Sequence, residues 1–450
     1  MIRSMSLQEL QGIIGGTLRD NAVFSAVSTD TRKLSPGDLF IALTGPNFNG
    51  NQFVNQAHTS GACAALTSEL VSSDLPTLTV ADTRMALGKL GAWNRAQSSA
   101  TVIALTGSQG KTSVKEMTAA ILARCGATLY TQGNLNNHIG APLTLLQIDA
   151  QHRFAVIELG ANHKGEIAYT TQLTRPDIAL INNVAATHIE GFGSLQGVAE
   201  GKSELWQGLG PDGTAVVNLD DPNVRARAPA GVRQVGISTA GDAAADYRVG
   251  AVSARGLEGS SFMLHTPAGS QEVTIHVPGL HNVANSLAAA ALAMEAGATL
   301  QDVALGLRDA NAAKGRLNVR KGWRGAVILD DSYNASPSSF RAAIDVLAGL
   351  PGLRIVVAGD MAELGADEEA EHRALGEYAA SRSIDHFYAS GVLTAHAVAA
   401  FGNKGVHLPG HEELASSLLP LLGPGVNVLV KGSRSAGMER VVKLLAEHED

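Results

Sequence analysis

Short apolar runs recur along the chain, and a helical pattern separates each run from the next. In the central part these runs are 101–105, 154–158, 178–181 and 214–217. Apolar strands that alternate with helices are typical of a parallel sheet covered on both faces. Residues 271–277 instead alternate between apolar and polar positions with a period of two. We therefore predict a parallel α/β sheet with a small antiparallel addition near 246–277.

The same alternation continues on both sides of this central part. Before it, short strands at 38–43 and 77–80 alternate with short helices, and a longer helix follows at 83–96. After it come strands that each lead into a polar or glycine-containing loop, at 326–330, 354–358 and 426–430. This second pattern is typical of a doubly wound domain, which binds ligands at the carboxyl ends of its strands. We predict an α/β fold with three domains, at 1–82, 83–313 and 314–450.

Composition narrows the class of protein. The chain has 450 residues, of which 45% are hydrophobic and 17% charged, as expected for a soluble globular enzyme. Its net charge of −8 argues against nucleic-acid binding. No apolar run reaches 18 residues, and Met1–Gly16 lacks the apolar core of a secretory signal, so no membrane span is expected. Cys63 and Cys125 have no metal-binding spacing and are expected to form no disulfide, which suits a reducing cytoplasm.

The most informative motif follows the strand at 101–105. Residues 106–113 read Thr-Gly-Ser-Gln-Gly-Lys-Thr-Ser and lead into a helix expected over 114–124. A glycine-rich turn between strand and helix aims backbone N–H groups at one point, where lysine reaches phosphates and threonine can bind magnesium. The loop is shorter than the standard P-loop, since Leu105 occupies the position of its first glycine, so an ordinary strand–helix turn is the alternative. We predict a nucleoside triphosphate site at Gly107, Ser108, Gln109, Gly110, Lys111, Thr112 and Ser113.

Three residues beyond this loop each have more than one interpretation. Glu158 ends an apolar strand, where a carboxylate holds magnesium in P-loop folds or is simply solvated. His188 follows the strand at 178–181, but a lone histidine is more often structural and magnesium prefers oxygen ligands. Lys202 lies early in a helical pattern and, from the residues alone, is expected to be a surface lysine.

Polar residues also gather at three other loops. Asn282 and Asn285 are one turn apart at the start of an alanine-rich helix, where they could face one ligand or cap the helix. The loops 330–337 and 431–435 combine acids, hydrogen-bonding side chains and positive charge, which suits an anionic or amide substrate or an ordinary polar loop. Within the first of these, Ser336 and Pro337 are predicted to cap and begin a helix.

In their order along nearly the whole chain, these motifs resemble those of the Mur ligases. The most specific runs are 133–144, 330–337, 359–365 and 431–434, and the runs 28–32 and 38–45 resemble the UDP-sugar-binding domain of that family. One departure is Ser336, where the corresponding branch usually has asparagine after alanine. The resemblance implies a three-domain Mur ligase architecture: a UDP-sugar-binding domain, a central P-loop domain, and a C-terminal Rossmann-like domain that binds the amine substrate and closes over ATP.

The resemblance also implies roles for individual residues. The catalytic residues would be Lys111, Glu158, His188, Lys202, Arg316 and Asp331. Magnesium would be held by Thr112, Glu158, His188 and a carbamate formed from carbon dioxide on Lys202. ATP would contact the P-loop together with Asn282, Asn285, Arg316 and Asp331. The other substrates would contact Ser28, Thr31, Arg32, Thr44, Gly45, Asn134, Asn136, Asn137, Tyr333, Asn334, Lys431, Ser433 and Arg434.

The implied reaction is ATP-dependent amide bond formation. It joins D-alanyl-D-alanine to UDP-N-acetylmuramoyl tripeptide through an acyl phosphate, as a cytoplasmic step of peptidoglycan precursor synthesis, and a monomer is expected. One alternative is folylpolyglutamate synthetase, which shares the last two domains but lacks the first. A second is a Mur ligase for another amino acid, against which residues 134–137 argue. A third is a regulatory P-loop ATPase, which would need no amine acceptor.

Overall fold

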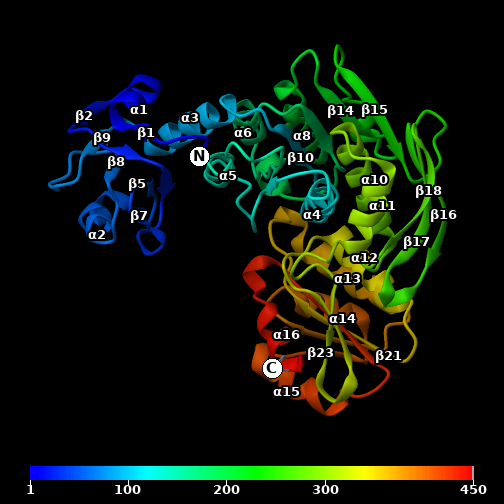
Figure 1. Cartoon of the computed structure of the whole chain (residues 1–450). Helices are drawn as coiled ribbons and strands as arrows, with labels where there is room; N and C mark the ends of the chain where they lie inside the picture. The colour runs from blue at the N-terminus through cyan, green and yellow to red at the C-terminus, as the bar shows by residue number, and fades with distance from the viewer. Residues whose placement is uncertain (448–450) are drawn as a thin grey trace.

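The computed structural model describes residues 1–447, and most of its strands lie in three large sheets that follow one another along the chain. Figure 1 shows the three bodies that result: the first domain stands apart from the other two, and the C-terminal body lies beneath the middle one. The predicted three-domain α/β architecture is confirmed at this level. The boundaries at 82/83 and 313/314 stay predictions. No described helix has the length and apolar character needed to cross a membrane.

The first sheet has five strands, of which only the edge strand β2 is antiparallel to its neighbour. Their order is β2 (Thr17–Arg19), β9 (Thr77–Thr79), β8 (Ala64–Thr67), β5 (Asp38–Ile41) and β4 (Ala26–Ser28). Helix α3 (Thr83–Ala96) is capped by Asp82, whose carboxylate accepts from two backbone N–H groups. Leu87 and Leu90 of α3 pack into the core of the first sheet, and the same helix contacts α5 (Gly140–Leu145) of the middle domain. Helix α3 therefore joins the first two domains.

The middle sheet has nine strands, and the P-loop strand lies inside it. Their order is β11 (Thr128–Tyr130), β12 (Phe154–Glu158), β10 (Thr101–Thr106), β13 (Ile178–Ile181), β14 (Thr214–Asn218), β15 (Arg233–Ser238), β16 (Tyr247–Ala254), β17 (Ser260–Thr266) and β18 (Gly269–Ile275). The pairs from β11 to β16 are parallel, whereas β16, β17 and β18 pair antiparallel, which confirms the predicted addition. The chain passes from β10 to neighbours on both of its sides, and such a switch point is where α/β sheets bind ligands.

Alternate residues of β10 enter two different cores. Ile103 and Leu105 pack under α4 (Lys111–Leu122), α10 (Leu280–Glu295) and α11 (Leu300–Asp309). Val102 and Ala104 instead pack with α5, α6 (Glu166–Thr174) and the segment that follows α8 (Leu195–Ser203). Because side chains alternate across a strand, an uninterrupted apolar run is needed to fill both cores. Helix α4 starts three residues earlier than expected, at Lys111.

The third sheet has six strands, and only its edge strand β19 is antiparallel to its neighbour. Their order is β19 (Asn318–Lys321), β20 (Val327–Asp331), β24 (Val426–Lys431), β21 (Leu353–Gly359), β22 (His386–Ser390) and β23 (Gly405–His407). One face packs on α12 (Pro337–Ala348), α13 (Glu368–Ser381) and α14 (Thr394–Phe401), and the other on α15 (His411–Leu418) and α16 (Glu439–Leu445). As predicted, Ser336 caps α12 and Pro337 is its first residue, within a capping box closed by Ser339.

Candidate active site

The P-loop connects β10 to α4, and its conformation depends on a glycine, Gly110. Gly110 has φ +75°, and a Cβ atom there would lie 2.2 Å from Asn285 Oδ1 and 2.6 Å from Asn182 Nδ2. Glycine is therefore required at this position, because it adopts the positive φ angle without strain and has no Cβ atom to clash with the two asparagines. Lys111 Nζ donates to the carbonyl oxygen of Gly107 at 2.7 Å, so the lysine folds back over its own loop. The loop lies between a buried strand and the start of a helix, as predicted, and its role in binding a nucleoside triphosphate stays a prediction.

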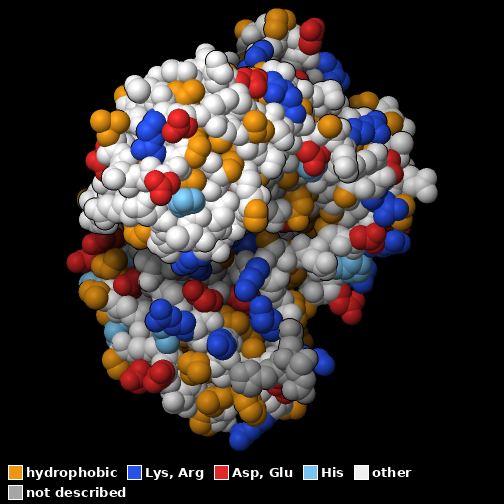
Figure 2. Space-filling model, turned by 60° about the vertical axis from the view of Figure 1, so that its left-hand side comes forward, with side chains coloured by type: hydrophobic (Ala, Val, Ile, Leu, Met, Phe, Trp, Pro, Cys, Tyr) orange, Lys and Arg blue, Asp and Glu red, His pale blue; other side chains and the backbone are white. Residues whose placement is uncertain are grey.

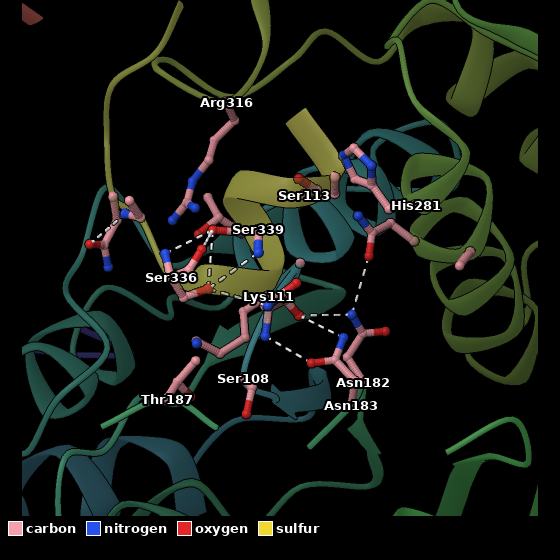
Figure 3. A pocket seen from close by; sticks show the side chains of 18 of the residues that line it. Ser108, Lys111, Ser113, Asn182, Asn183, Thr187, His281, Arg316, Ser336 and Ser339 are labelled. Carbon is pink, nitrogen blue, oxygen red and sulfur yellow. Dashed lines mark hydrogen bonds between the residues drawn. The ribbon is translucent and has the colours of Figure 1, made fainter. Parts of the chain in front are cut away.

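Asparagine amides fix the P-loop from the neighbouring strand and helix (Figure 3). Asn182 Nδ2 donates to the Gln109 carbonyl oxygen at 2.9 Å and to Asn285 Oδ1 at 3.2 Å. Asn285 Nδ2 in turn donates to Asn282 Oδ1 at 3.0 Å, and Asn183 Oδ1 accepts from the Gln109 N–H at 2.8 Å. Asn282 and Asn285 do line the cavity described below, but their amides also brace the P-loop. No role was predicted for Asn182 or Asn183, although both follow β13, a buried strand next to β10.

Glu158 and Lys202 lie deep beside the P-loop. Glu158 is 2% exposed, and its Oε1 accepts from Asn136 Nδ2 at 2.8 Å. Its Oε2 is buried and has no hydrogen-bond partner among residues 1–447. Lys202 is also 2% exposed, so the expectation of a surface lysine is wrong, and it lies in the last turn of α8 rather than early in a helix. Burial, and then the positive charge of Lys111, lower the pKa of Lys202 well below its ordinary value. Burial likewise lowers the pKa of Lys111, against the attraction of Glu158.

His188 contacts the third domain. It has φ +54°, and its Nδ1 forms an ion-pair contact with the carboxylate of Glu363, which itself has φ +63°. The contact with His188 lowers the pKa of Glu363. Left-handed backbone at two non-glycine residues that touch across a domain boundary is a strained arrangement, of the kind that clusters at functional sites. Among the described residues, no three His, Cys, Asp or Glu side chains form a metal-binding group.

Three charged residues of the third domain meet the P-loop from the other side. Asp331, at the end of β20, pairs with Lys431, which is 1% exposed and also donates to the Asn334 carbonyl oxygen at 2.9 Å. Arg316 lies 4.5 Å over the ring of Tyr333, and its Nε is buried without a hydrogen-bond partner. Figure 3 shows Arg316 extending toward the side of the pocket where Lys111 and Ser336 lie. An unsatisfied guanidinium N–H beside a P-loop suits an anionic ligand.

A cavity of about 760 Å³ lies between the middle and third domains. Figure 2 shows a groove between the upper and lower bodies, with Lys and Arg side chains along its lower side. Many of the predicted site residues line this cavity, namely Ser108, Gln109, Gly110, Lys111, Thr112, Ser113, His188, Asn282, Asn285, Arg316, Asp331, Asn334, Lys431, Ser433 and Arg434. The cavity also has lining residues for which no role was predicted, among them Asn218, Asp220, Ser238, Thr239, His281 and Glu363.

Other predicted residues lie outside the cavity lining. Gly107, Glu158, Lys202 and Tyr333 are next to lining residues. Asn136 reaches the site through Glu158, whereas Asn137 Oδ1 accepts from the Gly140 N–H at the start of α5. Asn134 belongs to the same loop. Ser28, Thr31, Arg32, Thr44 and Gly45 all belong to the first domain.

Comparison with known proteins identifies the family. Three family models match the chain, described as Mur ligase family, catalytic domain (residues 23–91), Mur ligase middle domain (105–293) and Mur ligase, glutamate ligase domain (315–434). The chain is 48% identical to the UDP-N-acetylmuramoyl-tripeptide–D-alanyl-D-alanine ligase of Escherichia coli K12 over 99% of both chains. The chain belongs to the Mur ligase family.

Solved structures agree with this assignment. A crystal structure of MurF from Acinetobacter baumannii superposes on this Mur ligase with a TM-score of 0.91, at 35% identity over 98% of both chains. MurF from Thermotoga maritima, solved in complex with ADP, gives a TM-score of 0.81 at 27% identity, over 93% of this chain and 96% of that one. The architecture inferred from the motifs is therefore that of solved family members.

Proposed function

We propose that this Mur ligase joins the amino group of D-alanyl-D-alanine to the terminal carboxylate of UDP-N-acetylmuramoyl tripeptide, with cleavage of ATP to ADP and phosphate. The observation that carries the proposal is the interdomain cavity, in which the P-loop lysine, Lys111, and the third-domain Arg316 line one space. The similarity to the Escherichia coli ligase along the full chain supports the choice of substrates. The product is a peptidoglycan precursor made in the cytoplasm.

The reaction needs ATP because a carboxylate is a poor electrophile. Transfer of the γ-phosphoryl group to the tripeptide carboxylate forms an acyl phosphate and releases ADP. The amine then attacks the acyl carbon, and the tetrahedral intermediate expels phosphate as the amide forms. Lys111, the P-loop N–H groups and Arg316 stabilise the charge that spreads over the γ-phosphoryl oxygens. Asn282, Asn285 and Asp331 complete the nucleotide site.

The residues beside the P-loop fit a magnesium ion. Glu158 Oε2 is a buried carboxylate oxygen without a protein partner, and the hydroxyl of Thr112 is part of the cavity lining. Oxygen atoms of this kind are the ligands magnesium prefers. His188 is a weaker match, since its Nδ1 faces Glu363 and a ligand would use Nε2 or displace that carboxylate. When bound, magnesium would neutralise charge on the phosphate oxygens.

Lys202 fits a carbamate for a related reason. Burial and the charge of Lys111 lower the pKa of Lys202, which favours its neutral form, and the neutral amine is the form that reacts with carbon dioxide. The carbamate would place a further oxygen ligand beside Lys111. Its negative charge would be attracted to Lys111, whereas a protonated Lys202 is repelled by it.

The remaining predicted residues are assigned to the other two substrates. The first domain, with Ser28, Thr31, Arg32, Thr44 and Gly45, binds the UDP end of the tripeptide substrate. The loop with Asn134, Asn136 and Asn137 binds its peptide end near Glu158. In the third domain, the amine substrate contacts Tyr333, Asn334, Lys431, Ser433 and Arg434. Contacts across the cavity, such as Gln109 with Ser336, hold the domains together around the acyl phosphate and keep water from hydrolysing it.

The test is ADP release with magnesium, ATP and UDP-N-acetylmuramoyl tripeptide, with and without D-alanyl-D-alanine. Release that needs both substrates supports the proposal. Folate accepted in place of the tripeptide would indicate a folylpolyglutamate synthetase, and a different amino acid accepted in place of the dipeptide would indicate another Mur ligase. Release without any amine would indicate a regulatory ATPase.

A further inference from the structure

Three acidic side chains of the described residues line the interdomain cavity: Asp220, Asp331 and Glu363. The proposed amine substrate carries an α-ammonium group at neutral pH, because an α-amino group has a pKa of about 7.7–8.0. A carboxylate that is free to exchange its partner is the group expected to recognise such an ammonium. The three carboxylates differ in the groups that they already contact, and this difference indicates which of them could bind the ammonium.

Asp220 and Asp331 are already engaged within their own domains. Asp220 accepts from the Ser238 hydroxyl at 2.6 Å, and from the backbone N–H of Thr239 at 2.7 Å and its hydroxyl at 2.9 Å. Asp331 is buried, pairs with Lys431 and accepts from the Leu317 N–H at 3.1 Å. Both carboxylates therefore already hold their own loops in place.

Glu363 differs from both in its exposure and its partner. It lies in the loop after β21, its side chain is 46% exposed, and its ion-pair contact is with His188 of the middle domain. Within residues 1–447 it forms no ion pair with a lysine or arginine, and a second histidine, His163, also lies near it. Its contact therefore crosses the domain boundary and can be exchanged when a ligand enters the cavity.

Glu363 lies where the amine substrate is expected to approach the acyl phosphate. His188 and its neighbour Thr187 line the cavity together with Lys111, where the acyl phosphate is proposed to form. Glu363 faces that point from the third domain, which is the domain assigned to the amine substrate. Its left-handed backbone, at φ +63°, places it opposite His188. A cationic amine drawn to Glu363 would arrive next to the acyl carbon.

We propose that Glu363 binds the ammonium group of the incoming amine substrate, which replaces His188 as the partner of its carboxylate. The inference rests on the proposed function and adds a recognition residue to it. Glu363 orients the amine. The ammonium loses one proton to water, because only the neutral nitrogen can attack the acyl carbon, and the other bonds made and broken are those of the ligation itself. Since a charge-assisted contact in a partly exposed site contributes modestly, loss of the charge should weaken amine binding by about 10-fold.

The test compares full-length wild-type enzyme with Glu363→Gln, Glu363→Asp and the control Glu368→Gln. Glu368 is an exposed carboxylate at the start of α13, outside the cavity lining. Steady-state KM values are measured for D-alanyl-D-alanine and for ATP. The inhibition constant of N-propionyl-D-alanine, which has the dipeptide skeleton without the amino group, is measured in competition with the dipeptide.

For Glu363→Gln we expect the KM of the dipeptide to rise about 10-fold, with the KM of ATP and the inhibition constant of the desamino analogue within about twofold of wild type. Glu363→Asp should recover part of the loss, and Glu368→Gln should match wild type. If the KM of the dipeptide is unchanged in Glu363→Gln, or the analogue weakens by the same factor as the dipeptide, ammonium recognition by Glu363 is overturned. A wild-type enzyme that ignores the dipeptide overturns the proposed function as well.

Discussion

Gln109 of the P-loop donates a hydrogen bond from Nε2 to Ser336 Oγ at 3.2 Å, across the boundary between the middle and third domains. The same amide nitrogen contacts Ser338 Oγ, also at the start of α12. The loop that receives the nucleotide is thus joined directly to the N-terminus of a third-domain helix. This contact gives ATP binding a way to influence how the two domains close.

Substitutions of Ser336 and Ser338 can distinguish an effect on domain closure from an effect on the stability of the third domain. Ser336 also caps α12, so Ser336→Ala should cost about 1 kcal/mol of third-domain stability in addition to the Gln109 contact. Ser338→Ala should lose only the contact. We expect both variants to show a lower kcat/KM for ATP but only Ser336→Ala to show a lower melting temperature. Kinetics and differential scanning calorimetry check this; equal melting temperatures would argue against the capping role.

Lys111→Ala tests the P-loop itself. The variant should lower kcat by at least about 100-fold, because the lysine stabilises charge on the transferred phosphoryl group. The melting temperature should stay close to that of wild type, since Lys111 bonds only to the carbonyl of its own loop. The matched control is Lys89→Ala, an exposed lysine of α3. Near-normal turnover in Lys111→Ala would remove the P-loop assignment.

Lys202→Ala tests the carbamate. The variant should be nearly inactive, and small carboxylates such as acetate should restore part of the activity by filling the space that the buried side chain leaves. Initial rates over a range of acetate concentrations, with chloride as the ionic-strength control, measure the rescue. Full activity without acetate would show that no carbamate is needed at this position.

The buried amine of Lys202 also predicts a pH dependence of stability. Its folded pKa is lowered by burial, so between that value and about pH 10.4 the unfolded chain binds a proton that the folded chain does not. The free energy of unfolding should therefore rise with pH by up to about 1.4 kcal/mol per unit from this group. In magnesium-free, carbon dioxide-depleted buffer, Lys202→Met should be more stable than wild type at pH 7, by a margin that shrinks at pH 9. A margin that does not change with pH would show that Lys202 is charged in the folded state.

The fold was largely predictable because its elements have strong local signals. The apolar strands β12 and β13 and the helix α3 have the predicted bounds, and Ser336 with Pro337 marks the start of α12. The antiparallel strand expected at 271–277 lies at 269–275, a shift of two residues that leaves its pairing intact.

From the residues alone, the site could be predicted only where one loop carries the chemistry, whereas the resemblance to the Mur ligases pointed to other lining residues such as Asn282, Arg316 and Asp331. The P-loop is contiguous, so its spacing and its strand–helix setting identify it. Lys202 was misplaced, because nothing in its neighbours reveals that α8 carries it beneath the P-loop and beside Lys111. Glu363 was given no role, since its contact with His188 joins residues that are far apart in the sequence and depends on how two domains meet.

The mass of the reaction product tests the central claim most directly. Purified enzyme is incubated with magnesium, ATP, UDP-N-acetylmuramoyl tripeptide and D-alanyl-D-alanine, and the nucleotide-linked products are analysed by mass spectrometry. The account predicts a species heavier than the tripeptide substrate by one dipeptide less one water, formed in equal amount to ADP. ADP formed with the tripeptide substrate unchanged in mass, or a product extended by a different amino acid, would contradict it.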